Sequence, residues 1–89
     1  MALFTLGNVV ATPAALAYCE QHKMNPLRLL GRHIGGDWGD LSQDDVKANE
    51  NAITYGGRVF SSYKVGDGRV WVITEADRSS TCVMLPEDY

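Results

Sequence analysis

The sequence predicts an α+β fold, with three short helices packed on a three- to four-stranded antiparallel sheet. A C-terminal β-meander forms the main part of this sheet. In the first half of the chain, a capping residue followed by proline occurs twice, which is typical of helix starts. In the last third, β-branched and aromatic residues are separated by glycine-containing turns, which is typical of strands. The 89 residues are enough for one core, so we expect residues 1–89 to form a single α+β domain.

The helix starts are the strongest local signals in the chain. Thr12 precedes Pro13, and Asn25 precedes Pro26. In each pair the first side chain can accept a hydrogen bond from the helix backbone, and the proline already has a helical φ. A short β-prone run at residues 7–11 comes before the first of these starts. We therefore expect two short helices, the second of which ends at the glycine pair that follows it.

Apolar spacing indicates which sides of these helices face the core. The periodic residues are Leu16, Cys19 and Lys23 in the first helix and Leu27, Leu30 and Ile34 in the second. Ser42 and Asp45 have the spacing of a capping box, so a third helix should begin there and run to about Tyr55. Gly56 and the glycine after it should end this helix.

The last third of the chain predicts a meander of three strands. Residues 58–65 and 69–75 form the first two strands, and the tight turn at 66–68 contains the Asp-Gly pair that is common in hairpins. A third strand is expected at 81–85, before a proline that ends it. Residues 7–11 are expected to add a fourth strand at an edge of this sheet.

The charge of the chain limits the classes of partner. A net charge of -3 gives no general electrostatic attraction for nucleic acid or anionic membranes, so we expect no direct binding to either. No apolar run approaches the roughly 20 residues of a membrane span, and the N-terminus lacks a basic leader, so a cytoplasmic protein is expected. Cys19 and Cys82 are expected to be reduced and buried, and a disulfide between them is the alternative.

Candidate catalytic groups are few. His22 and His33 lie late in predicted helices, where an imidazolium interacts favourably with the negative helix end. Asp37 and Asp40 lie near His33 at loop spacing, which does not favour a metal site. We therefore predict no metal, no cofactor and no enzymatic activity. The alternative is a hydrolytic site assembled from distant segments. It would join His33, Asp37 and Asp40 to Glu75, Asp77 or Arg78.

The loop at residues 35–41 is the most distinctive feature, because it places a tryptophan among glycines and carboxylates. We predict a protein-binding surface here and at the start of the third helix, since tryptophan often dominates binding energy. Its residues are Asp37, Trp38, Asp40, Asp44, Asp45 and Glu50. The alternative is that Trp38 folds back over the small core. Tyr89 is a second candidate aromatic anchor, unless the C-terminus is a frayed tail.

Four segments of the chain, residues 6–13, 35–41, 49–50 and 71–79, resemble a family of small uncharacterised bacterial proteins of plasmids, phages and integrative elements. Members of this family are often labelled type I restriction endonuclease subunit M. A DNA methyltransferase subunit needs a cofactor-binding α/β domain and an Asn- or Asp-Pro-Pro-aromatic turn, and Asn25-Pro26-Leu27 is not such a turn. The resemblance therefore implies a mobile genetic element as the source, and it identifies no catalytic residues.

Two functions follow as expectations. The first is a small protein-binding inhibitor that docks on a host defence nucleoprotein complex, such as a CRISPR or restriction complex, and occludes its nucleic-acid-binding surface. The acidic balance of the chain would suit a basic groove on such a partner. The second is a regulatory or assembly module for maintenance of the element, acting as a homodimer or larger homo-oligomer.

Overall fold

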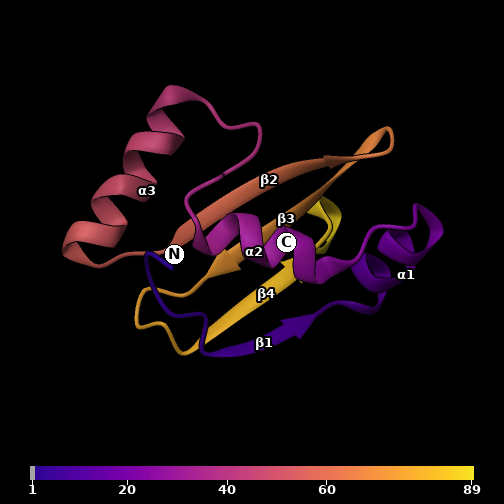
Figure 1. The fold of residues 1–89 in the computed structure, drawn as a ribbon, viewed down its shortest axis with the longest axis horizontal. Helices are drawn as coiled ribbons and strands as arrows, with labels where there is room; N and C mark the ends of the chain where they lie inside the picture. The colour runs from indigo at the N-terminus through magenta and orange to yellow at the C-terminus, as the bar shows by residue number, and fades with distance from the viewer. Residues whose placement is uncertain (1) are drawn as a thin grey trace.

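The computed structural model describes residues 2–89 and has an α+β architecture, as the sequence predicts (Figure 1). The elements in chain order are β1 (Asn8–Ala11), α1 (Pro13–Gln21), α2 (Pro26–Ile34), α3 (Gln43–Tyr55), β2 (Val59–Val65), β3 (Gly68–Thr74), β4 (Ser80–Met84) and the short 3-10 helix η1 (Pro86–Asp88). The three helices and the meander of β2, β3 and β4 are confirmed.

The four strands form one sheet in the order β1-β4-β3-β2. β2, β3 and β4 pair in antiparallel fashion, but β1 pairs with β4 in parallel, so the sheet is mixed and not fully antiparallel as predicted. Asn8 pairs with Ser80, and because so much chain separates these residues, no hairpin fixes the direction of β1. Its expected position at an edge of the sheet is confirmed.

All three helices begin at the predicted caps. The side-chain oxygens accept hydrogen bonds from backbone N–H groups, Thr12 from Ala15 at 3.1 Å, Asn25 from Leu27 at 3.0 Å and Ser42 from Asp45 at 3.2 Å. The predicted hairpin has a two-residue loop, in which Gly66 has a φ of 61°. A glycine with positive φ at the first loop position is typical of a type II′ turn, which suits the twist of the two strands.

The predicted buried sides of α1 and α2 are correct in part, since Cys19 and Leu30 are buried as expected but Leu16 and Leu27 are not. α1 buries Ala15 and Cys19 and leaves Leu16 exposed. α2 buries Leu29, Leu30 and His33, whereas Leu27 is 70% exposed. Both helices have only nine residues, and periodicity over about two turns does not identify every buried position.

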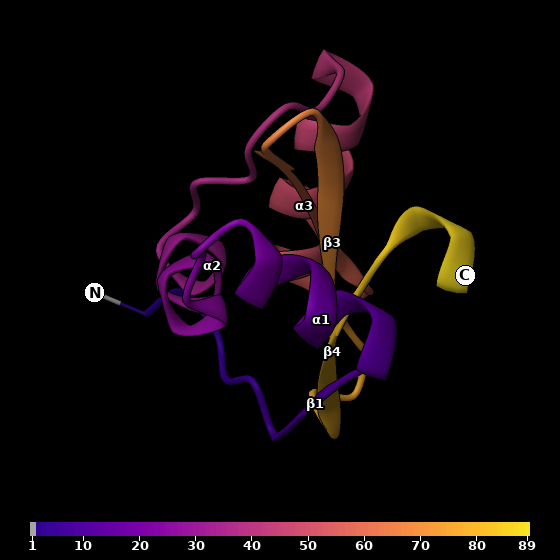
Figure 2. The ribbon, with the colours of Figure 1, turned by 90° about the vertical axis from the view of Figure 1, so that its right-hand side faces the viewer.

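The core consists of two clusters. The larger cluster lies on one face of the sheet, and the smaller one lies at one end of it. Figure 2 views the sheet nearly edge-on, with α2 on one side and η1 on the other. The larger cluster joins α1 and α2 to Tyr63, Val70, Val72 and Val83 of the sheet. The smaller cluster joins Trp38, Ala52 of α3 and Val59 of β2, with partly buried side chains around it.

β2 is an edge strand whose outer side is covered by α3 and the preceding loop (Figure 1). Buried Asn49 of α3 donates to the backbone oxygen of Phe60 at 2.6 Å and accepts from its N–H at 3.0 Å. One amide side chain thus satisfies both outward backbone groups of a strand residue. This contact protects the edge from further pairing and fixes α3 against the sheet.

Replacing Asn49 with alanine should lower the free energy of unfolding by about 1–3 kcal/mol, because it leaves two backbone groups of Phe60 without partners. Urea unfolding followed by circular dichroism measures this loss. Asn51→Ala is the matched control, since Asn51 is exposed on the same helix and its variant should unfold like the wild type. Equal stability of the two variants would contradict a clamping role for Asn49.

Candidate functional site

The predicted site loop at residues 35–41 lies along the outer edge of β2. Ser62 donates its N–H to the backbone oxygen of Trp38 at 3.0 Å, and Asp40 donates its N–H to the oxygen of Ser62 at 2.8 Å. Gly39, between them, has a φ of 75°, and a Cβ at this position would lie 2.2 Å from the Ser62 oxygen. The glycine therefore permits the close approach of loop and strand.

Trp38 lies in the core. Its side chain is 8% exposed, and its ring stacks near Phe4 with centroids 6.3 Å apart and meets His33 edge-on at 5.9 Å. This position is the one that the alternative interpretation expects, and it corrects the expectation of an exposed Trp38 anchor. The glycines of the loop turn the chain back so that the ring covers the end of the sheet.

The six predicted binding residues divide into three groups. Asp37 accepts from Nε and Nη2 of Arg32 at 2.8 and 3.3 Å, and these hydrogen bonds lower the pKa of Asp37 below its ordinary value. Asp40 pairs with Arg69 at 3.2 Å. Both carboxylates therefore have internal counter-charges, whereas Trp38 is buried.

The remaining acids lie exposed on α3. Asp44, Asp45 and Glu50 form no ion pair among residues 2–89. A hollow of about 290 Å³ lies beside Asp44 and Glu50, with Leu41 and Val46 as its apolar lining and Lys47 as a basic lining residue. Of the predicted acidic face, this part keeps its charge available to a partner.

His33 belongs to a buried chain of polar groups. Its Nδ1 lies 2.5 Å from the Ser61 hydroxyl, and its Nε2 lies 2.9 Å from the Thr74 hydroxyl. The Thr74 hydroxyl is in turn hydrogen-bonded to the Thr81 hydroxyl. The His33 side chain is 0% exposed, and burial lowers its pKa to about 4. The ring is therefore neutral near pH 7, which corrects the expected imidazolium at a helix end.

The structure does not join the groups of the alternative hydrolytic site. His33 is hydrogen-bonded to hydroxyls, Asp37 to Arg32, and Asp40 to Arg69. Arg78 donates to backbone oxygens of α3 and of the segment after it, including Ala52 at 3.0 Å. Among residues 2–89, no three histidine, cysteine or acidic side chains form a metal-ligand group.

The face of the sheet opposite α1 and α2, called here the open sheet face, carries an aromatic cluster. Phe60 and Trp71 meet edge-on at 5.0 Å, and Trp71 meets Tyr89 at 6.0 Å. Arg58 donates to the Tyr89 hydroxyl at 2.9 Å and lies 3.4 Å from Glu75. A hollow of about 220 Å³ on this face is lined by Arg58, Phe60, Trp71, Ile73 and Tyr89.

The C-terminal turn holds Tyr89 against this face. The Thr12 hydroxyl donates to the Asp88 carboxylate at 2.6 Å, and the same carboxylate accepts from the N–H of Leu85 at 3.0 Å. The end of the chain is therefore anchored and not frayed. Alternation along β2 and β3 places Phe60 and Trp71 on one face, so the sequence carries the signal for half of this cluster.

The chain has no match among the family models, curated proteins and solved structures with which it was compared. No helix within residues 2–89 has the length and apolar character needed to cross a bilayer. Both cysteines are free thiols; Cys19 is buried as expected, but Cys82 is only half-buried. The function must therefore be argued from the surfaces of the molecule.

Proposed function

We propose that this chain is a non-enzymatic protein-binding module whose contact surface is the open sheet face. The observation that carries this proposal is the gathering of Arg58, Trp71 and Tyr89 around one hollow. Arginine, tryptophan and tyrosine are the residue types that most often dominate the energy of protein interfaces. Tyr89 is 73% exposed, so a partner would bury a large aromatic surface there.

Burial of the polar chain around His33 supports binding over catalysis. The His33 and Ser61 pair has the short separation of a base and a nucleophile, but both side chains are 0% exposed. A substrate carbonyl cannot approach a hydroxyl that is fully covered by core side chains. The groups that chemistry would need thus stabilise the interior, and the reactive-looking contact has a structural role.

The partner class that we propose is a host defence nucleoprotein complex of the CRISPR or restriction type. The exposed acids of α3 support a basic partner surface, because opposite charges accelerate encounter and orient the complex. In this arrangement Asp44, Asp45 and Glu50 face basic groups that otherwise hold nucleic acid. The aromatic cluster supplies the affinity.

Affinity capture with tagged variants tests the proposed surface. Tyr89→Ala and Trp71→Ala should each reduce recovery of the partner by about tenfold or more, which is the size of effect expected for a dominant interface residue. Leu27→Ala is the matched control, since Leu27 is a large exposed apolar residue on α2, outside both the open sheet face and α3. It should recover the partner like the wild type.

Thermal melts accompany each capture, so that loss of the partner is separated from loss of the fold. A folded Tyr89→Ala variant that recovers the same partner at the wild-type level would contradict the open sheet face as the contact surface. Reversal of the charges of Asp44 and Asp45 should slow association at low salt and have less effect at high salt.

A second candidate function is a homo-oligomeric assembly module. β1 is the other edge strand of the sheet, and its Val9 and Val10 are exposed. An uncovered edge with apolar side chains favours pairing with a second sheet edge. Sedimentation of the wild-type chain separates the two functions, since a stable dimer at micromolar concentration would favour assembly over binding of a foreign partner.

A further inference from the structure

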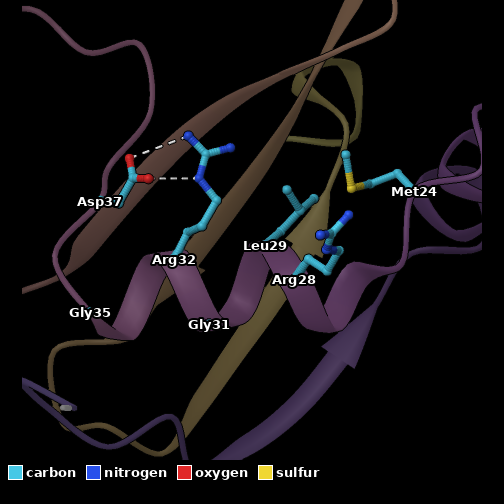
Figure 3. Close-up of a pocket in the computed structure, with 7 residues that line it drawn as sticks. All are labelled: Met24, Arg28, Leu29, Gly31, Arg32, Gly35 and Asp37. Atoms are coloured by element: carbon cyan, nitrogen blue, oxygen red, sulfur yellow. Dashed lines mark hydrogen bonds and ion pairs between the residues drawn. The ribbon is translucent and has the colours of Figure 1, made fainter.

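A groove of about 610 Å³ runs along α2, on the side of the molecule away from the open sheet face (Figure 3). Its polar side chains are Arg28, Arg32 and Asp37, and its apolar side chains are Met24 and Leu29. In Figure 3 the two arginines rise from the same side of α2, on either side of Leu29. We call this feature the α2 groove.

Arg32 already binds a carboxylate within the α2 groove. Its guanidinium holds Asp37 through two nitrogens, at 2.8 and 3.3 Å, and lies 4.5 Å from the centre of the Tyr63 ring. The Tyr63 hydroxyl in turn donates to the backbone oxygen of Asp37 at 2.7 Å. The groove is therefore preorganised on this side, with a fork of donors matched to a planar two-oxygen acceptor.

Arg28 lies one helical turn before Arg32 and has no comparable partner. Its side chain makes no hydrogen bond or ion pair among residues 2–89. A cation in the first turn of a helix is also unfavourable, because the N-terminal end of the helix is already positive. Arg28 therefore does not stabilise α2 through the helix dipole, and its charge faces the groove without a counter-ion.

We infer that the α2 groove binds an acidic peptide segment, with a carboxylate on Arg28 and a neighbouring apolar side chain against Met24, the half-buried apolar residue of its lining. The lining favours a carboxylate over a phosphate. It offers no lysine or hydroxyl to match additional phosphate oxygens, and one of its two arginines is already occupied.

Gly31 lines the α2 groove and has no side chain, so a substitution at this position can block the groove. A Cβ built on Gly31 would meet no atom within 4 Å, so there is open space for a side chain to begin at this groove-lining position. Replacing a helical glycine also favours the helix. Gly31→Leu should therefore fill the site and leave the fold intact. The α2 groove and the open sheet face lie on opposite sides of the sheet, so each proposal is tested separately.

The test is a titration of the ¹⁵N-labelled chain with an acetylated, amidated hexapeptide of alternating glutamate and leucine, followed by amide chemical shifts. We expect saturable shifts confined to residues 24–37. Arg28→Ala should weaken binding about fivefold, the size expected for a solvent-exposed ion pair, and Gly31→Leu should abolish it. Arg69→Ala is the matched control, since it removes an arginine outside the groove and should bind like the wild type.

Two further probes define the ligand class. The same hexapeptide with glutamine in place of glutamate should give no saturable shift. Inorganic phosphate should bind to the wild-type chain no more tightly than the acidic peptide binds to the Arg28→Ala variant. Unchanged peptide binding by a well-folded Arg28→Ala variant would overturn the proposal. Absence of a saturable shift at millimolar peptide would do the same, as would phosphate binding as tight as that of the acidic peptide.

Discussion

Replacing Trp38 with alanine is expected to lower the free energy of unfolding by about 3–5 kcal/mol, the usual cost of removing a large aromatic side chain from a core. Trp38 is 8% exposed and packs with Phe4, His33 and the α3 residue Ala52. A small domain has a total stability of only about 5–15 kcal/mol, so the variant should be largely unfolded on modest heating. Thermal melts followed by circular dichroism measure the effect.

Trp71→Ala is the matched control, because it removes the same side chain from the half-buried open sheet face. It should keep the fold with a smaller loss of stability and lose the protein partner. A Trp38→Ala variant that melts like the wild type but fails to recover the partner would show that Trp38 is an exposed anchor in solution. The two tryptophans thus separate stabilisation of the core from binding.

Local signals account for the parts of the fold that the sequence predicts. Thr12, Asn25 and Ser42 cap helices by bonding to N–H groups two or three residues away, so neighbouring residues alone determine these helix starts. The hairpin at Gly66 depends equally on adjacent residues. Elements whose decisive contacts lie within a few residues are therefore readable from sequence.

Contacts between distant segments account for what the sequence does not predict. His33 bonds to Ser61 and Thr74, 28 and 41 residues away, and no local pattern distinguishes this buried histidine from an exposed one at a helix end. The direction of β1 depends on its pairing with β4 across most of the chain. Periodicity identified buried Cys19 and Leu30 in the two nine-residue helices but wrongly included exposed Leu16 and Leu27.

The candidate site follows the same division. The loop at residues 35–41 was predicted from its composition, but the pairing of Asp40 with Arg69 joins residues 29 positions apart and could not be read from spacing. Alternation along β2 and β3 does indicate the shared face of Phe60 and Trp71. Alternation alone does not show that this face is open, because that depends on α1 and α2 covering the other face. It also does not show that Tyr89 folds back against the sheet.

The stability of the protein should fall as the pH is lowered from about 6.5 to about 4, because His33 is buried as a neutral ring. Burial lowers the pKa of His33 to about 4 in the folded state, whereas an unfolded histidine titrates near 6.5. Between these values the unfolded chain binds a proton that the folded chain excludes, so acid favours unfolding. The full loss amounts to about 3 kcal/mol, and the contribution of His33 is complete above pH 6.5.

Urea unfolding at a series of pH values measures this slope, and His33→Gln provides the comparison. The variant should be less stable at pH 7, because it disturbs the bonds to Ser61 and Thr74, but its stability should change little between pH 6.5 and 4.5. Asp37, Asp77 and Asp88 have little effect over most of this range, because hydrogen bonds lower the pKa of each carboxyl and the stability they contribute is lost mainly as the pH falls through and below about 4. A wild-type curve as flat as that of His33→Gln would mean that the folded chain accommodates a protonated His33, which the covered ring and its two hydroxyl partners argue against.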